Sequence, residues 1–309
     1  MTLGDVIPRL LDAGSELKPS LLGQLSGLTP EEQRELLERW NDIPTSRRLM
    51  IIRAVTGMAE DNIEMEFTGL LCAALADDDA PVRASAAAGL WETGDRIVIA
   101  PLVAMLESDE SHEARAAAAS ALGHFAELAE EGKLIDRDVA VVRNALLGAL
   151  EDSEEETAVR RRALEAIAPM RHADVSDWIR WAYRSGEPLL RQSAVYAMGR
   201  TCDPVWLPII EQEFGSSVAA MRFEAANAAR ELADAKTLPH LHDLVTDDDP
   251  QVSLAAVHAI GGIGGAAARK LLKHYVEQGD PTLSEAAQEA LRALEADEGD
   301  FSMLALEEP

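Results

Sequence analysis

Histidines and a glycine-rich segment are the first residues of this 309-residue sequence whose types and spacing could form a chemical site. His240 and His242 are two residues apart, so on a helix their side chains point about 200° apart and do not readily share a metal ion. The segment GGIGG at 261–265 lacks the G-x-G-x-x-G spacing, the following Lys-Ser/Thr and the preceding strand of a nucleotide loop. We interpret it as a turn, and the sequence predicts neither a metal site nor a cofactor.

Arginines at regular intervals show how the chain is organised. They mark one position of a repeat, with serine in the last two copies, and the successive spacings are 35, 32, 45, 31, 31, 31 and 31 residues. Four consecutive spacings of 31 residues indicate a repeat protein. The anchor positions are Arg48, Arg83, Arg115, Arg160, Arg191, Arg222, Ser253 and Ser284.

Apolar residues surround each anchor at helical spacing. They lie one residue before it and three, six and seven residues after it, which is the stripe of an amphipathic helix. The third position after the anchor is alanine in seven copies, which predicts a close helix crossing where no larger side chain fits. These alanines are Ala86, Ala118, Ala163, Ala194, Ala225, Ala256 and Ala287. A second apolar helix lies between copies, so the sequence predicts an all-α chain of helical hairpins with a period of about 31 residues.

The turns between helices carry capping residues. Asp79 and Asp249 stand directly before a helix and are followed by proline in its first turn, which predicts N-caps. Three glycines fall where the same helix is expected to end, and we predict left-handed caps there. They are Gly123, Gly199 and Gly261.

The helix starts PVRASAAAGLW (81–91) and EARAAAASALG (113–123), with acidic turns before them, resemble HEAT repeats of the short, phycobilisome lyase-type family. The resemblance implies a right-handed α-solenoid of about eight HEAT-like hairpins over residues 45–295. Residues 1–44 are expected to form an N-terminal helical cap and the first helix of repeat one. Residues 296–309 form an acidic C-terminal tail, either a frayed terminus or a docking peptide.

The 45-residue spacing departs from the regular period. It holds about 14 extra residues near 126–138, which we expect to extend one helix and lengthen a loop. The insertion is either a surface feature or a lip on the binding groove.

The site requirements of HEAT-like enzymes can be compared with the residues of this chain. HEAT-like deoxyhypusine hydroxylases hold two iron ions through several His-Glu pairs, whereas this chain has one such pair, His112-Glu113. HEAT-like DNA glycosylases need a cationic groove, which an acidic chain does not offer. A bilin-lyase role needs mainly a groove with a few polar contacts, and it stays open as an alternative.

The charge of the chain limits its partners. With 28 basic and 55 acidic residues the net charge is −27, which repels nucleic acid and anionic membranes. Cys72 and Cys202 form no metal motif, and the absence of an apolar span or leader indicates a cytoplasmic protein. We expect the anchor arginines to pair with turn acids of the neighbouring repeat. The remaining acids form either a solvated rim or a docking ridge for a basic protein segment.

Variable positions one and five residues after the anchor share a face that the apolar stripe leaves uncovered. In HEAT-type arrays the second helix of each hairpin lines the concave face, where extended partners bind. The predicted partner-binding residues are Glu165, Gln192, Tyr196, Phe223, Asn227, His258, Glu285 and Glu289. Trp178, Trp181 and Trp206 form either an aromatic patch or ordinary packing between helices.

These observations predict a non-catalytic scaffold that binds a protein or peptide, with a basic segment, on its concave face. The alternatives are a small-ligand-handling protein of the bilin-lyase type and a module that assembles with itself. The sequence does not determine the oligomeric state.

Overall fold

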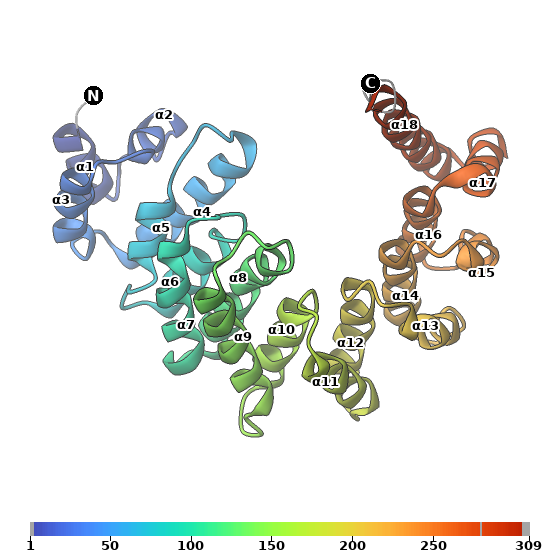
Figure 1. The fold of residues 1–309 in the computed structure, drawn as a ribbon. Helices are drawn as coiled ribbons and strands as arrows, with labels where there is room; N and C mark the ends of the chain where they lie inside the picture. The colour runs from blue at the N-terminus through green and yellow to red at the C-terminus, as the bar shows by residue number, and fades with distance from the viewer. Residues whose placement is uncertain (1–2, 279, 305–309) are drawn as a thin grey trace. The chain divides into compact units, whose positions relative to one another are not determined.

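The computed structural model describes residues 3–278 and 280–304 (Figure 1). These residues form 18 α-helices and four short 3-10 helices, and no strand occurs among them. The predicted all-α class is therefore confirmed. Consecutive helices from α3 onward form eight hairpins, in agreement with the predicted number of repeats.

Residues 1–170 form one compact unit, unit 1, and residues 171–309 form a second, unit 2. The sequence did not predict this division, which falls between two repeats. Unit 1 contains α1 (Leu3–Leu11), α2 (Pro19–Leu22), η1 (Gly23–Leu25), α3 (Pro30–Trp40), α4 (Thr45–Asp61), α5 (Thr68–Ala74), α6 (Ala80–Ala88), η2 (Arg96–Val98), α7 (Ile99–Ser108), α8 (His112–Glu130), α9 (Asp136–Glu151) and α10 (Thr157–Ile167). Unit 2 contains α11 (Ala173–Arg184), α12 (Pro188–Arg200), η3 (Pro204–Trp206), α13 (Leu207–Glu213), α14 (Ala219–Leu232), η4 (Ala235–Thr237), α15 (Leu238–Leu244), α16 (Pro250–Ile263), α17 (Gly265–Gln278) and α18 (Pro281–Leu304).

Within each unit the second helices of successive hairpins pack on one another. In unit 1 the row is α4, α6, α8 and α10, and in unit 2 it is α12, α14, α16 and α18 (Figure 1). All seven alanines three residues after the anchor are fully buried in these rows. A larger side chain at such a crossing would push the helices apart, which explains why alanine recurs there.

The predicted glycine caps are wrong. Gly123, Gly199 and Gly261 lie inside helices, and none of them has a positive φ. A Cβ atom at Gly199 would lie 2.6 Å from the Cα of Ala228, and one at Gly261 would lie 2.8 Å from the Cβ of Ala290. These glycines therefore allow the next second helix to approach closely.

The anchor arginines form a ladder of ion pairs, as predicted. Nε and Nη2 of Arg83 donate to the two carboxylate oxygens of Asp109, each over 2.7 Å. Arg115 binds Glu155 in the same two-pronged way, and so does Arg222 with Asp247. In each case the acid lies before the next second helix, so the arginine ties two repeats together.

The predicted aspartate caps are present. Asp79 accepts a hydrogen bond from the backbone N of Val82, and Asp249 accepts one from Gln251. Only the end of the GGIGG segment forms the predicted turn: Gly264 and Gly265 have positive φ where α16 meets α17, whereas Gly261, Gly262 and Ile263 lie within α16.

Two departures from the regular period are visible in the helix lengths. The extra residues near 126–138 lengthen α8 to 19 residues and α9 to 16. The expected boundary at residue 296 falls within α18, which continues to Leu304, and 305–309 lie outside the described residues. No helix in the described part of the chain is both long and apolar enough to cross a membrane.

Candidate partner-binding site

A groove of about 290 Å³ lies between α12 and α14 in unit 2. It contains three of the predicted partner-binding residues, Tyr196, Phe223 and Asn227. The full lining is Tyr196, Arg200, Phe223, Glu224, Asn227, Ala228, Arg230 and Glu231. Residues far apart in the sequence are therefore brought into one small surface, which we call the α12–α14 groove.

Helical spacing explains how the groove is built. Tyr196 and Arg200 are one turn apart on α12, and Asn227 and Glu231 are one turn apart on α14. The buried alanine stripe of each helix faces its neighbours, so these polar positions remain at the surface. Tyr196 keeps 38% of its surface exposed.

Polar contacts cross the groove between the two helices. Nε2 of Gln192 donates to Oε1 of Glu224 over 2.9 Å, which makes a fourth predicted residue part of the site. Nη1 of Arg200 lies 3.4 Å from Oε2 of Glu231. Arg230 donates to the other oxygen of Glu231 over 3.0 Å. The first two contacts link α12 to α14, whereas the Arg230–Glu231 bond lies within α14, and Tyr196, Phe223 and Asn227 line the groove beside them.

Gly262 on α16 supports the arginine side of the groove. A Cβ atom at this glycine would lie 2.4 Å from Cγ of Arg230, so the aliphatic stem of Arg230 lies directly over Gly262. The third repeat of this row thus helps to position a groove residue of the second.

The remaining predicted residues lie elsewhere. His258 is exposed on α16, and Glu285 and Glu289 are exposed one turn apart on α18, but none of these three lines the groove. Glu165 belongs to unit 1, where it binds Arg162 on its own helix over 2.6 Å. The predicted set is therefore only partly brought together by the fold.

Five groove residues were not predicted as site residues, namely Arg200, Glu224, Ala228, Arg230 and Glu231. Two of them could have been predicted from their positions in the repeat. Arg200 and Glu231 lie nine residues after their anchors, one turn beyond the positions that predicted Tyr196 and Asn227. Extending the variable face by one helical turn would have found both.

The predicted aromatic patch is only partly at the surface. Trp178 and Trp181 pack edge to face with ring centroids 5.3 Å apart, and Trp181 is 37% exposed. Trp206, in contrast, is buried, and the guanidinium of Arg180 lies 5.0 Å from its ring centre. Trp206 is thus a core residue rather than part of an exposed patch.

The buried Glu213, the last residue of α13, links that helix to α11 and α12. Glu213 accepts hydrogen bonds from the hydroxyl of Tyr183 and, over 2.6 Å, from Nη2 of Arg191. Burial and the bond to Glu213 raise the pKa of Tyr183. Arg191 is an anchor arginine, so the ladder continues here with an acid from within α13 instead of a turn acid.

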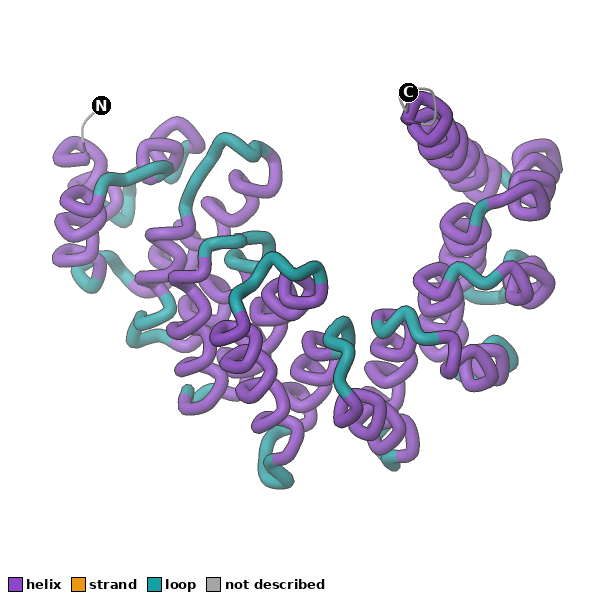
Figure 2. The backbone as a smooth tube through the Cα atoms, in the orientation of Figure 1, coloured by secondary structure: helices purple, strands orange, loops and turns teal. Residues whose placement is uncertain are grey.

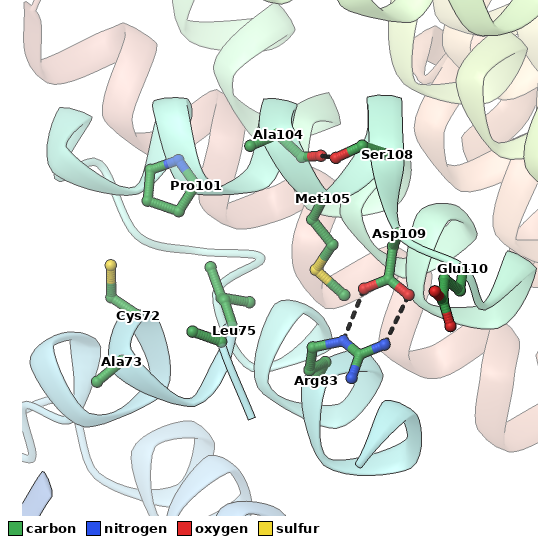
Figure 3. A pocket seen from close by; sticks show the side chains of 11 residues that line it. Cys72, Ala73, Leu75, Arg83, Pro101, Ala104, Met105, Ser108, Asp109 and Glu110 are labelled. Carbon is green, nitrogen blue, oxygen red and sulfur yellow. Dashed lines mark hydrogen bonds and ion pairs between the residues drawn. The ribbon is translucent and has the colours of Figure 1, made fainter. Parts of the chain in front are cut away.

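A larger pocket of about 540 Å³ lies between α5 and α7 in unit 1 (Figure 3). Most of its lining is apolar, including Leu75, Pro101 and Met105. Figure 3 shows the Arg83–Asp109 ion pair at one end and Cys72 at the other. Burial raises the pKa of the Cys72 thiol, so it stays protonated at neutral pH.

The histidines do not form a metal site among the described residues. No three His, Cys, Asp or Glu side chains in this part of the chain are grouped as metal ligands. His240 stacks on Phe214 and His242 contacts the hydroxyl of Tyr275, so the two rings face different helices. Nε2 of His112 lies 3.2 Å from Oε1 of the adjacent Glu113.

A comparison of the sequence with known protein families identifies its repeats. A family model described as HEAT repeats matches residues 68–151, 143–218 and 207–292, which together span most of the chain. The chain is a HEAT-repeat protein. HEAT repeats generally mediate protein binding. No curated protein matches the sequence.

Solved structures share the fold at low sequence identity. The complex of CpcE and CpcF of phycocyanin lyase from Nostoc sp. PCC7120 is 17% identical, with a TM-score of 0.54, over 92% of this chain and 97% of that chain. Human deoxyhypusine hydroxylase in complex with glycerol is 18% identical, with a TM-score of 0.38, over 86% and 96% of the two chains. The first similarity supports the HEAT-like fold of this protein, as the sequence had indicated.

Proposed function

We propose that this HEAT-repeat protein is a non-catalytic scaffold that binds an extended protein segment on unit 2. The binding surface is the second-helix face, formed by the exposed residues of α12, α14, α16 and α18. The observation that carries the proposal is the α12–α14 groove, in which Tyr196, Phe223 and Asn227 lie together. Aromatic side chains beside polar groups are typical anchors of protein interfaces.

Electrostatics favours a partner segment with basic residues. The net charge of −27 attracts basic proteins at long range, and Glu285 and Glu289 add two exposed carboxylates on α18. The groove itself contains both signs of charge, with Arg200 and Arg230 beside Glu224 and Glu231. We therefore expect the charge of the whole second-helix face to attract the partner, and the α12–α14 groove to determine which segment of it binds.

A pull-down with two variants tests the proposal. The full chain, the double variant Tyr196→Ala/His258→Ala and the control Val205→Ala capture proteins from a lysate of the source organism at low and high salt. Val205 is 52% exposed and lies outside the groove, on η3. We expect a basic protein whose capture falls about fivefold or more in the double variant, and which is lost at high salt. Equal capture by all three chains would refute the placement.

A second candidate function is the handling of a small apolar ligand in unit 1. The pocket between α5 and α7 favours it, because its 540 Å³ is a common size for ligand sites and most of its lining is apolar. Native mass spectrometry of the purified protein tests this function. A bound small molecule that disappears in Ala104→Leu, which fills the pocket, would support it, and a mass equal to the bare chain would count against it.

A further inference from the structure

A hollow of about 230 Å³ lies in unit 1, where α4 and α6 end and the loop to α5 begins. We call it the Trp91 hollow. Its lining is Thr56, Ala59, Glu60, Ile63, Met65, Glu66, Phe67, Thr68, Leu71, Gly89, Trp91, Glu92 and Thr93. Figure 2 shows the long loop that joins the C-terminal end of α4 to α5. The Trp91 hollow has only acidic residues among its charged lining groups, whereas the α12–α14 groove has both acidic and basic residues.

The position of Trp91 in the repeat explains why it is exposed. It lies eight residues after its anchor, where three of the six later repeats carry Gly123, Gly199 and Gly261, which allow close helix packing. The helix α6 ends at Ala88, before this position, so Trp91 is not held in a helix crossing. Trp91 therefore lies outside the row of helices, with 49% of its surface exposed.

Apolar side chains at the mouth of the hollow are unusually open to solvent. Ile63 is 98% exposed, close to the value of an isolated residue. Phe67 and Leu71 are buried beneath and form the apolar floor. An exposed isoleucine and tryptophan over one hollow are typical of a docking surface.

All charged residues that line the hollow are acidic. They are Glu60, Glu66 and Glu92, and neither lysine nor arginine is among the lining residues. The C-terminal ends of α4 and α6 also meet here, and neither helix has a basic residue in its last turn. The partial negative charge of two helix ends therefore adds to that of the carboxylates.

Glycine at position 89 makes room for one of the residues that line the hollow. The Oγ1 atom of Thr56 is buried and has no hydrogen-bond partner among the described residues. It lies against Gly89, where a Cβ atom would be 2.4 Å from it, so a larger residue at 89 would displace Thr56.

We propose that the Trp91 hollow binds a lysine or arginine side chain of a partner protein, with a neighbouring apolar residue of that partner against Ile63. The cation lies over the Trp91 ring and between the carboxylates of Glu60 and Glu92. This site goes beyond the second-helix face of unit 2. It rests on the proposed function in one respect, because both assume that the partner is a protein.

A peptide titration tests the hollow without knowledge of the natural partner. The probe is a fluorescein-labelled peptide of alternating leucine and arginine between glycines, and fluorescence anisotropy reports its binding to the full chain. The matched probe has glutamine in place of each arginine. We expect Trp91→Ala and the double variant Glu60→Gln/Glu92→Gln each to weaken binding of the arginine peptide about fivefold to tenfold.

Three controls separate this site from other acidic or aromatic surfaces. Trp181→Ala removes an exposed tryptophan from unit 2, and Glu107→Gln removes an exposed acid outside the hollow. Both variants should bind the peptide as the parent does. Tyr196→Ala/His258→Ala should also bind it normally, so failure of the proposed function and failure of this site are distinguishable.

Three results would overturn the proposal. They are equal affinity for the arginine and glutamine peptides, unchanged affinity in Trp91→Ala, and no binding to the parent chain at peptide concentrations up to about 1 mM, the weak limit of specific recognition.

Discussion

Replacing Gly199 by alanine should destabilise unit 2, although alanine is the better helix former. In an exposed helix this change gains about 1 kcal/mol. At Gly199 the new Cβ would lie 2.6 Å from the Cα of Ala228, about 1 Å inside normal contact. The obstacle is backbone, so α12 and α14 must separate, at a cost of about 3 kcal/mol. We expect a net loss of about 2 kcal/mol in the free energy of unfolding.

Two other helical glycines give a graded control. Gly148 in α9 has no atom within 4 Å of its added Cβ, so Gly148→Ala should stabilise the protein by about 1 kcal/mol. Gly123 has a closest approach of 3.3 Å, to Ala166, and Gly123→Ala should fall between the two. Urea unfolding followed by circular dichroism at 222 nm measures all three midpoints.

The order of these midpoints shows whether the close approach of α12 and α14 requires glycine at position 199. If Gly199→Ala is as stable as Gly148→Ala, the close helix approach does not limit the packing. A further variant, Gly199→Asn, separates packing from capping. Asparagine is tolerated at a left-handed cap but is larger than alanine. We therefore expect Gly199→Asn to be less stable than Gly199→Ala, and the reverse order would restore the cap interpretation.

Three further predictions concern single residues. Ala233 has a left-handed φ of 50° and is exposed, whereas Gly264 has the equivalent position one repeat later, so Ala233→Gly should raise the free energy of unfolding by about 0.5–1 kcal/mol in urea titrations. The Arg222 pair lowers the pKa of Asp247, so its stabilisation is present above the ordinary aspartate pKa and is lost as pH falls through the lowered value. Arg222→Gln should therefore cost about 1–3 kcal/mol at pH 7 but clearly less at pH 3, and an equal loss at both would contradict the ion pair. Burial raises the pKa of Tyr275 to about 12, so its ultraviolet titration should be centred well above the ordinary tyrosine pKa of about 10, and a midpoint near 10 would contradict its burial.

Repeat spacing predicted the hairpins because each copy must bury the same stripe against its neighbour. Ala194 and Ala225 illustrate this, since both are fully buried where second helices cross. The glycine positions were misread for a physical reason. A glycine that recurs near the expected end of a helix fits either a cap or a close approach, and the backbone φ and the distance from Gly199 to Ala228 distinguish them.

The candidate site was predicted less completely than the fold. Tyr196 and Asn227 were found because they lie five residues after their anchors, at a variable position on the face that the apolar stripe leaves uncovered. Arg230 was missed because its orientation depends on the space above Gly262, a contact between repeats that no single helix encodes. The exposure of Trp91 likewise depends on where α6 ends, and helix ends are set by local packing.

The arginine ladder gives the array a direction. Arg222 needs Asp247 from the repeat that follows, so a chain cut between them leaves a guanidinium without its carboxylate. Ser253 instead donates to the backbone oxygen of Asp247, which precedes it. A nascent chain emerging from the ribosome must therefore expose the Arg222 charge until the next hairpin is made, whereas Ser253 is satisfied as soon as its own helix forms. Removing the last serine-anchored repeat, α17 and α18, from the C-terminal side leaves the Arg222–Asp247 pair intact and should lower the free energy of unfolding little. A shorter chain that also lacks Asp247 should lose more, because Arg222 then has no carboxylate.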